Sequence, residues 1–255
     1  MIHETLRPAL RPTMITHAAT ISAEVGAEVV LISEVEQHTG SFKFRAAYNV
    51  AASVPNEMLI AASSGNFGQA LACACQLLKK RAIIVMPHTS AKVKIAGVQG
   101  YGATVDIIDV NEVGRAQRVA QLAKEYPNAR VCSAYDDPLV IAGNSTLGEE
   151  IATADLGLDA VVVPIGGGGL SSGVITGLRR CGDPTPVFGA EPLLGNDAAR
   201  SLRQNKLVCN DHEPLTIADG ARTISLGRHN WEVIRDAIAD IVEVPDSAIE
   251  QGVRL

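Results

Sequence analysis

The stretch VVVPIGGGGLSSG, residues 161–173, decides the fold class of this chain. It reads as a short β-branched run, then four consecutive glycines, then small residues that can continue as a helix. A strand that enters a helix through a glycine turn is typical of a βαβ unit, in which helices join parallel strands. Four glycines in a row lose much backbone entropy on folding, so a ligand is the expected reason for them. Their N–H groups at a helix N-terminus suit a phosphate.

The same alternation of strand-like and helix-like segments continues outward through nearly the whole chain. Its spacing predicts right-handed βαβ units, and hence an α/β fold of open, mostly parallel sheets with helices on both faces. A polar stretch at residues 133–137 interrupts the rhythm and indicates a boundary between two domains. The predicted strands are residues 29–35, 59–62, 83–86, 104–110, 160–165, 187–191 and 241–244.

The composition excludes several classes of protein. The 255 residues are 47% hydrophobic and 20% charged, which is typical of a globular chain. A net charge of −6 argues against a nucleic-acid or anionic-membrane surface. Two runs without charged residues, 58–78 and 160–178, are interrupted by glycines and polar residues, so neither is predicted to span a membrane. Cysteines without CxxC spacing and an N-terminus without a signal-peptide pattern favour a cytoplasmic protein with free thiols.

A lysine with an unusual environment lies in TGSFKFRAA, residues 39–47. Gly40 marks the entry to a predicted helix that puts Lys43 in its first turn, where the helix dipole disfavours a cation. Phe42 and Phe44 flank the lysine, so its amine is expected to be desolvated. Both effects lower a lysine pKa and make the neutral amine available as nucleophile or base. The alternative is a solvated surface lysine.

A second loop from strand to helix is SSGNFGQA, residues 63–70. Its hydroxyls and N–H groups could hold a carboxylate, although such residues also simply cap helices. The glycine run at residues 166–169 does not fit GxGxxG, and the chain has no GK[ST] motif. A dinucleotide-binding or nucleoside-triphosphate fold is therefore disfavoured.

A desolvated lysine, a carboxylate-type loop and a phosphate-type loop are the parts of a pyridoxal-phosphate enzyme. The chain resembles the fold-type II pyridoxal-phosphate enzymes, specifically the serine/threonine dehydratase and serine racemase group, and cysteine and cystathionine synthases are a weaker match. The resemblance covers essentially the whole chain. Its motifs are SFKFRAA (41–47), SSGNFGQA (63–70), GGGGL (166–170), AEP (190–192), ADGAR (218–222) and WEVIRD (231–236).

The resemblance implies a role for each matching residue toward the cofactor, pyridoxal 5'-phosphate. Lys43 would form the Schiff base, with Phe42 packed against the cofactor ring. Asn66 would donate to the ring oxygen. The phosphate would be held by the glycine loop, that is by Gly166, Gly167, Gly168, Gly169 and Leu170.

The substrate carboxylate would bind to Ser63, Ser64 and Asn66, with Arg115 near it. Phe67 stands where the family often has histidine, which puts one carboxylate contact in doubt. In racemases of this group, the serine at the place of Ser64 exchanges a proton on the face opposite the lysine; its other role is only that of a carboxylate donor.

A metal site is also implied. Glu191, Gly195 and Asp197 form the pattern with which relatives bind a divalent cation through two carboxylates and a backbone carbonyl. Hard oxygen ligands suit Mg²⁺ or Ca²⁺. The alternative is a helix N-terminus that carries acids because the helix dipole favours them.

The resemblance implies the two-domain fold of the tryptophan synthase β-subunit. Residues 1–54 and 136–255 would form the large cofactor-binding domain, and residues 55–135 the small domain with the substrate-carboxylate loop. The sequence stops at Leu255, before a further segment of the large domain that relatives have. We therefore expect this C-terminal part to be missing, in either a truncated chain or a degenerate relative. A homodimer is the expected assembly.

The expected activity is that of an ammonia-lyase, a dehydratase that converts a small amino-acid substrate, L-threonine or L-serine, to a 2-oxo acid and ammonia. One alternative is a serine racemase that uses Lys43 and Ser64. An alternative of another class is a catalytically impaired relative that binds the cofactor or a partner. No nucleic acid or membrane is expected as a partner.

Overall fold

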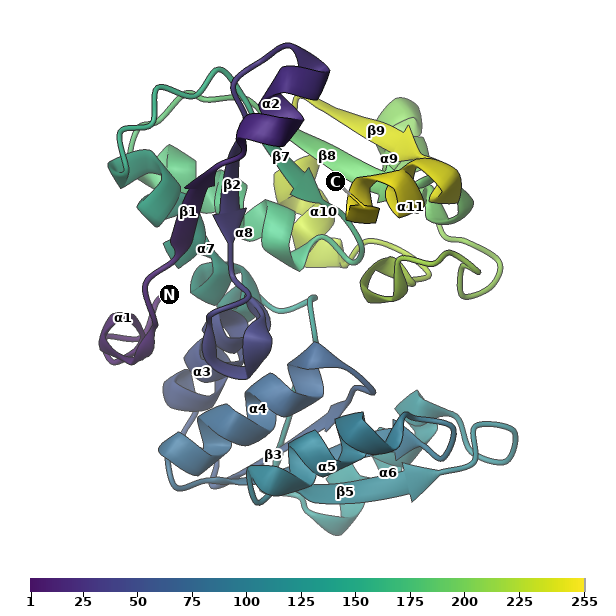
Figure 1. The fold of residues 1–255 in the computed structure, drawn as a ribbon. Helices are drawn as coiled ribbons and strands as arrows, with labels where there is room; N and C mark the ends of the chain where they lie inside the picture. The colour runs from purple at the N-terminus through teal and green to yellow at the C-terminus, as the bar shows by residue number, and fades with distance from the viewer. Residues whose placement is uncertain (255) are drawn as a thin grey trace. The chain divides into compact units, whose positions relative to one another are not determined.

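Strands and helices alternate along the chain, as the sequence predicts (Figure 1). The computed structural model describes residues 1–254, and all seven predicted strands are present, with shifted ends. The chain divides into two compact units. The first contains Met1–Pro12 and Val35–Gly143, and the second contains Thr13–Glu34 and Asn144–Leu255. These units group residues 35–54 with residues 55–135, which the predicted division separates.

The first unit contains a four-stranded parallel sheet with the strand order β5-β4-β3-β6. Leu59 lies opposite Ala82, and Ile84 lies opposite Val105. The elements of this unit are α1 (Leu6–Ala9), η1 (His38–Gly40), α3 (Lys43–Ser53), β3 (Met58–Ala62), α4 (Asn66–Leu77), β4 (Arg81–Pro87), α5 (Lys92–Gly100), β5 (Thr104–Ile108), α6 (Arg115–Glu125), β6 (Arg130–Val131) and the start of α7 (Pro138–Thr153).

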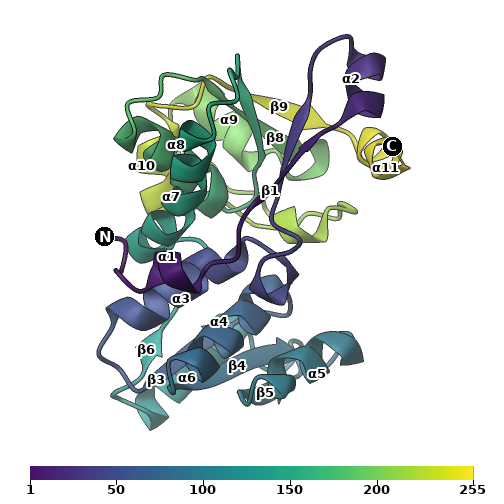
Figure 2. The ribbon, with the colours of Figure 1, turned by 60° about the vertical axis from the view of Figure 1, so that its left-hand side comes forward.

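Both faces of this sheet are covered, which is why its central strands are continuous apolar runs rather than alternating ones. Leu59 and Ile84 point into a core that also contains buried residues of α3 and α4. Ile60 and Val85 point to the opposite face, where Leu122 of α6 packs. Figure 2 shows this unit with α4, α5 and α6 labelled around β3, β4 and β5.

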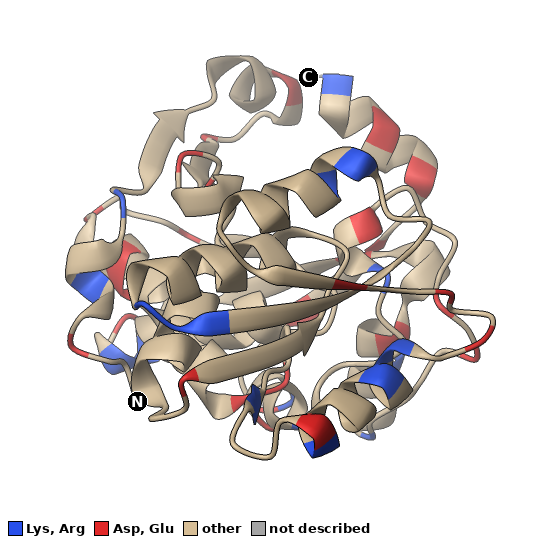
Figure 3. Ribbon diagram, turned by 90° about the horizontal axis from the view of Figure 1, so that it is seen from below, with Lys and Arg blue, Asp and Glu red and all other residues tan. Residues whose placement is uncertain are grey.

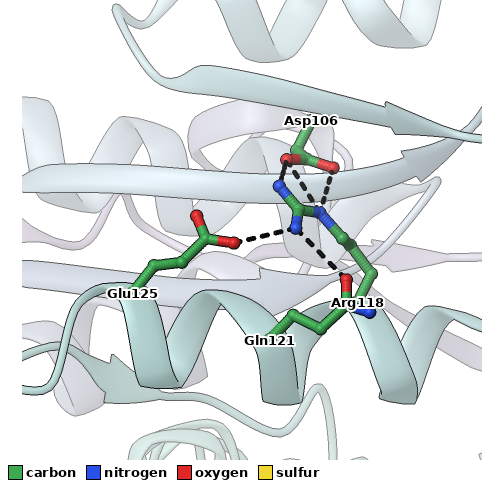
Figure 4. Close-up of polar contacts among 4 residues, drawn as sticks. All are labelled: Asp106, Arg118, Gln121 and Glu125. Atoms are coloured by element: carbon green, nitrogen blue, oxygen red, sulfur yellow. Dashed lines mark hydrogen bonds and ion pairs between the residues drawn. The ribbon is translucent and has the colours of Figure 1, made fainter.

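A polar cluster fastens α6 to the edge strand β5 (Figure 4). The guanidinium of Arg118 donates to both oxygens of Asp106, with its shortest bond at 2.7 Å. It also donates to Glu125 at 3.0 Å and to Gln121 at 3.2 Å. These bonds engage all three guanidinium nitrogens, so Arg118 holds the helix on the sheet.

The second unit contains a three-stranded parallel sheet in the order β7-β8-β9 and an antiparallel pair, β1-β2. The pair was not predicted as such, because all four residues of β1 are exposed and show no apolar alternation. The elements of this unit are β1 (Met14–His17), α2 (Ala19–Val25), β2 (Val30–Ser33), the rest of α7, β7 (Val161–Pro164), α8 (Gly169–Arg180), β8 (Val187–Pro192), η2 (Leu193–Gly195), α9 (Asp197–Gln204), η3 (Asp219–Ala221), α10 (Arg228–Ile234), β9 (Asp240–Val244) and α11 (Asp246–Arg254).

One face of this second sheet carries the core of the unit. Val163, Val187 and Ile241 pack there against buried residues of α7, α8 and α10. The other face carries Val162 and Val242, which are 68% and 55% exposed.

The surface agrees with the acidic, mixed-charge composition. In the view of Figure 3, lysines and arginines are interspersed with aspartates and glutamates. Among the described helices, none has the length and apolar character needed to cross a bilayer.

Candidate active site

Lys43 lies in the first turn of α3, as predicted. Its amine lies 4.7 Å from the centroid of the Phe42 ring and donates to the carbonyl oxygen of Ala134 at 3.4 Å. Burial lowers the pKa of Lys43 from 10.5 to about 8, because the charged ammonium loses its hydration. A substantial fraction of the amine is therefore neutral near pH 8 and can act as nucleophile or base.

Of the three phenylalanines in the two motifs, Phe42 contacts the Lys43 amine, whereas Phe44 and Phe67 are buried in the core. Phe42 lies beneath the amine, whereas Phe44 is fully buried and packs on the rings of His38 and Tyr48. Phe67 is 2% exposed and belongs to the same core. Because the side chain of Phe67 is buried in the core, it fills space there rather than offering a polar contact to a substrate.

The segment before Lys43 is held in place by Gln37, a residue that belongs to none of the sequence motifs. The Gln37 side chain accepts from the backbone N–H of Arg11 at 3.1 Å and donates to the Arg11 carbonyl at 3.0 Å. Thr39 and Gly40 follow with φ values of +62° and +73°. A β-branched residue rarely adopts such a φ, so Thr39 stores strain close to Lys43. Strain of this kind is common at functional sites.

The lowered pKa of Lys43 predicts a pH dependence of the stability of the protein without cofactor. Between pH 8 and 10.5 the unfolded lysine is protonated and the buried one is mostly neutral, so the unfolded state binds more protons and stability rises with pH. Buried Cys75 and Cys132, with pKa values raised to about 12, give the opposite slope. The free energy of unfolding is therefore measured by urea unfolding for the parent and for Lys43→Met at each pH. Both proteins contain the two cysteines, so the difference between their free energies of unfolding reports on Lys43 alone. A difference that does not change with pH would contradict the prediction.

The loop at residues 63–67 connects β3 to α4 and lies in the same unit as Lys43. The Ser63 hydroxyl accepts from the N–H of Gly68 at 3.0 Å and of Gly65 at 3.4 Å. Ser63 thus caps α4, the alternative role that the sequence left open, and its O–H remains able to donate. Ser64 is half-buried, and Asn66 begins α4 and is exposed.

Arg115 is the first residue of α6 and is exposed. It lies one helical turn before Arg118, which the cluster with Asp106 fixes to the sheet. The position of Arg115 is thereby set by α6, and its predicted role toward a substrate carboxylate stays a prediction.

The glycine loop lies between β7 and α8 in the second unit, at the strand–helix junction that the sequence predicts. Gly168 has φ +88°, and a Cβ there would lie 2.9 Å from the Cβ of Asn230 and from Leu226. A Cβ on Gly166 would lie 3.0 Å from the Cα of Ala221, within the ADGAR motif. Side chains are therefore excluded at both positions. Backbone N–H groups in the first turn of α8 lack intrahelical acceptors and suit a phosphate.

The candidate metal residues are gathered at the start of α9. Glu191 and Asp197 are both buried, and their carboxyl pKa values are raised by burial to about 8 and about 7. Glu191 accepts from the N–H groups of Ala198 and Ala199, each at 2.9 Å, so it caps α9. The Oδ2 atom of Asp197 has no hydrogen-bond partner among the described residues. That buried oxygen fits a cation ligand, although the described residues contain no cluster of three or more His, Cys, Asp or Glu suited to a metal.

Comparisons with known proteins agree with this geometry. Residues 6–255 match the family described as PALP, pyridoxal-phosphate dependent enzyme. An L-threo-3-hydroxyaspartate ammonia-lyase of a Pseudomonas species is 38% identical over 246 residues, which are 95% of this chain and 76% of the relative. Human serine racemase is 32% identical over 260 residues, an alignment that covers 99% of this chain and 76% of the racemase. The crystal structure of a T.th. threonine deaminase has a TM-score of 0.92 and 34% identity, covering 98% of this chain and 82% of that one.

This chain therefore belongs to the pyridoxal-phosphate-dependent enzyme family. Within the family, its relatives are fold-type II ammonia-lyases and serine racemases. The resemblance to fold-type II pyridoxal-phosphate enzymes and the predicted α/β fold are thereby confirmed.

The residues of this chain fit the cofactor that the family name specifies. The buried amine of Lys43 has the lowered pKa that imine formation requires. Gly168, at φ +88°, immediately precedes α8, and the backbone N–H groups of the first turn of α8 have no intrahelical acceptors, so they can bind the cofactor phosphate.

Proposed function

We propose that this protein is a pyridoxal-phosphate-dependent ammonia-lyase that converts a β-hydroxy amino acid to a 2-oxo acid and ammonia. The single observation that carries the proposal is the amine of Lys43, which is buried over Phe42 with a pKa lowered to about 8. Such an amine can accept a proton near neutral pH and return it. Membership of a family with many ammonia-lyases supports this reaction class.

Each group of the chain has a defined task in this reaction. Pyridoxal phosphate, when bound, supplies an electron sink for the charge that develops at the substrate Cα. The neutral amine of Lys43 removes the Cα proton. Ser63, Ser64 and Asn66 orient the substrate through its carboxylate, and the N–H groups of the glycine loop hold the cofactor phosphate.

The substrate is proposed to be L-serine or L-threonine. The relatives widen the panel that should be tested, because two of them are L-threo-3-hydroxyaspartate ammonia-lyases and one is an L-threonine ammonia-lyase. The test is release of 2-oxo acid and ammonia from each of these three amino acids by the protein loaded with pyridoxal phosphate. Turnover of any of them supports the reaction class, and the ratio of kcat/KM values identifies the substrate. Tight cofactor binding without product from all three would favour the non-catalytic alternative.

Racemisation is a second candidate, which Ser64 favours. Among the described residues, none hydrogen-bonds to the Ser64 hydroxyl, whereas the Ser63 hydroxyl already accepts from the N–H groups of Gly65 and Gly68. A racemase needs a second acid–base group on the face opposite the lysine, and serine racemases are among the relatives.

Reaction of L-serine in D₂O separates the two activities. Racemisation is expected to give D-serine deuterated at Cα, and this product should disappear in Ser64→Ala while pyruvate formation remains measurable. Ser53→Ala is the matched control, because Ser53 is half-buried like Ser64 but ends α3, away from the loop at residues 63–67. Deuterated D-serine formed at the parent rate by Ser64→Ala would exclude Ser64 as the second acid–base group, and pyruvate alone from the parent would exclude racemisation.

A divalent cation, Mg²⁺ or Ca²⁺, is proposed to bind to Glu191, Asp197 and the carbonyl of Gly195. At a hundredfold excess over its dissociation constant, such an ion should stabilise the folded protein by about 2.7 kcal/mol, and EDTA should reverse the gain. Asp197→Asn is the sharper variant, because Glu191 also caps α9. Thermal unfolding with and without the ion should show a shift in the parent and in Asp240→Asn, but none in Asp197→Asn. An equal shift in all three proteins would refute the site.

A further inference from the structure

Two buried asparagines hold two carbonyl groups of the glycine loop, those of Gly167 and Gly169. Asn230 of α10 donates its side-chain amide to the carbonyl of Gly167 at 2.6 Å. Asn144 of α7 donates in the same way to the carbonyl of Gly169 at 2.9 Å. Asn230 is 0% exposed and Asn144 is 1% exposed, so neither bond competes with water. The helices that carry them lie beside α8 in the second unit (Figures 1 and 2).

The carbonyl between these two is held as well. Gly168 accepts from the N–H of Ser172 at 2.9 Å and from the Ser171 hydroxyl at 3.1 Å. Gly227 adds a backbone N–H to the Gly167 carbonyl at 3.0 Å. Three consecutive peptide groups are thus fixed through their oxygens.

This arrangement decides where the N–H groups point. In a trans peptide the N–H and C=O bonds point in opposite directions. A carbonyl of Gly167 that faces Asn230 therefore turns the N–H of Gly168 away from α10. In the same way, the bond from Asn144 to Gly169 turns the N–H of Leu170 away from α7. The turned N–H groups lie at the start of α8, where a helix has no internal acceptors for them.

Glycine makes this approach of the asparagines possible. A Cβ on Gly168 would lie 2.9 Å from the Cβ of Asn230, and a Cβ on Gly173 would lie 2.4 Å from the Cβ of Asn144. The two asparagines therefore pack directly against the backbone of the glycine loop and of α8, with no side chain between them. Each asparagine also belongs to a helix that packs in the core of the unit.

We propose that Asn144 and Asn230 are positioning residues that orient the N–H groups of the glycine loop toward the phosphate of the cofactor. The inference rests on the proposed function, in which this loop holds that phosphate. Neither side chain is assigned a contact with the cofactor, and both act through the peptide groups that they hold. If an asparagine is replaced by an apolar residue of similar shape, the glycine carbonyl that it held stays buried but loses the amide donor. The peptide group of that carbonyl is then less firmly held and can rotate.

The test compares two ligands that differ only in the phosphate. Apoprotein of the full chain is titrated with pyridoxal phosphate and with pyridoxal, following the absorbance of the linkage to Lys43. In Asn144→Leu and in Asn230→Leu, the dissociation constant for pyridoxal phosphate is expected to rise about tenfold, while that for pyridoxal stays within about twofold of the parent. Far-ultraviolet circular dichroism checks that each variant folds. If a leucine variant does not fold, the same ratio is measured in Asn144→Ala and Asn230→Ala.

Asn49→Leu is the matched control. Asn49 is also fully buried and donates to a backbone carbonyl, that of Leu139 at 2.8 Å, but it lies in the first unit. Its variant should lose stability without a change in the ratio of the two dissociation constants. The inference is overturned if Asn144 and Asn230 variants weaken both ligands equally, or leave both unchanged. A parent that binds neither ligand would overturn the proposed function itself, and this inference with it.

Discussion

Replacement of Lys43 by alanine is expected to lower kcat/KM for 2-oxo acid formation by about 10³-fold or more, because the variant loses both the nucleophile and the base. The loss should not come from unfolding. Burial disfavours the Lys43 ammonium, as its lowered pKa shows, so alanine removes an unfavourable group from the apoprotein. Initial rates and urea unfolding of the same samples check both parts of the prediction.

Lys92→Ala is the control for this experiment. Lys92 begins α5 in the same unit and is exposed, so its replacement should change neither rate nor stability beyond a small surface effect. A Lys43→Ala protein that retains the parent rate would show that another group carries the chemistry.

The second large effect is expected for Gly168→Ala. The residue has φ +88°, and an added Cβ would lie 2.9 Å from Asn230 and Leu226 and 3.0 Å from Ile234. Left-handed backbone costs about 1–2 kcal/mol for a residue with a Cβ, and overpacking adds about 1–3 kcal/mol. The free energy of unfolding should therefore fall by about 2–5 kcal/mol, with weakened binding of pyridoxal phosphate.

Gly182→Ala separates the two causes. Gly182 has φ +72°, but a Cβ there would meet nothing within 4 Å, so only the backbone cost of about 1–2 kcal/mol applies. In urea unfolding, the free energy of unfolding should be highest for the parent, lower for Gly182→Ala and lowest for Gly168→Ala. Equal losses in the two variants would contradict the close packing at Gly168.

The sequence alone was enough to predict the parts of the fold that depend on local pattern. The strand at β7, the turn at Gly168 and the helix at α8 follow from a β-branched run, a glycine run and small residues in succession. β1 has four exposed residues and β6 has two residues, so neither carries an apolar pattern long enough to be recognised.

The candidate site was also predictable only in part, because only some of its features depend on local sequence pattern. The motif around Lys43 indicated a desolvated amine in a first helical turn, and the structure confirms this environment. The bonds from Lys43 to Ala134, and from Asn144 and Asn230 to the glycine loop, join residues that are 91, 25 and 63 positions apart. Contacts over such separations leave no trace in the spacing of a single sequence, so they require the fold.

Peptide mapping shows whether Lys43 binds the cofactor covalently, on which the proposed chemistry depends. Protein loaded with pyridoxal phosphate is reduced with borohydride, digested and analysed by mass spectrometry. A single pyridoxyl group per chain is expected, on the peptide that contains Lys43, with no stoichiometric label in Lys43→Ala. A stoichiometric label on another lysine, such as Lys80 or Lys92, with Lys43 unmodified, would show that Lys43 does not bind the cofactor.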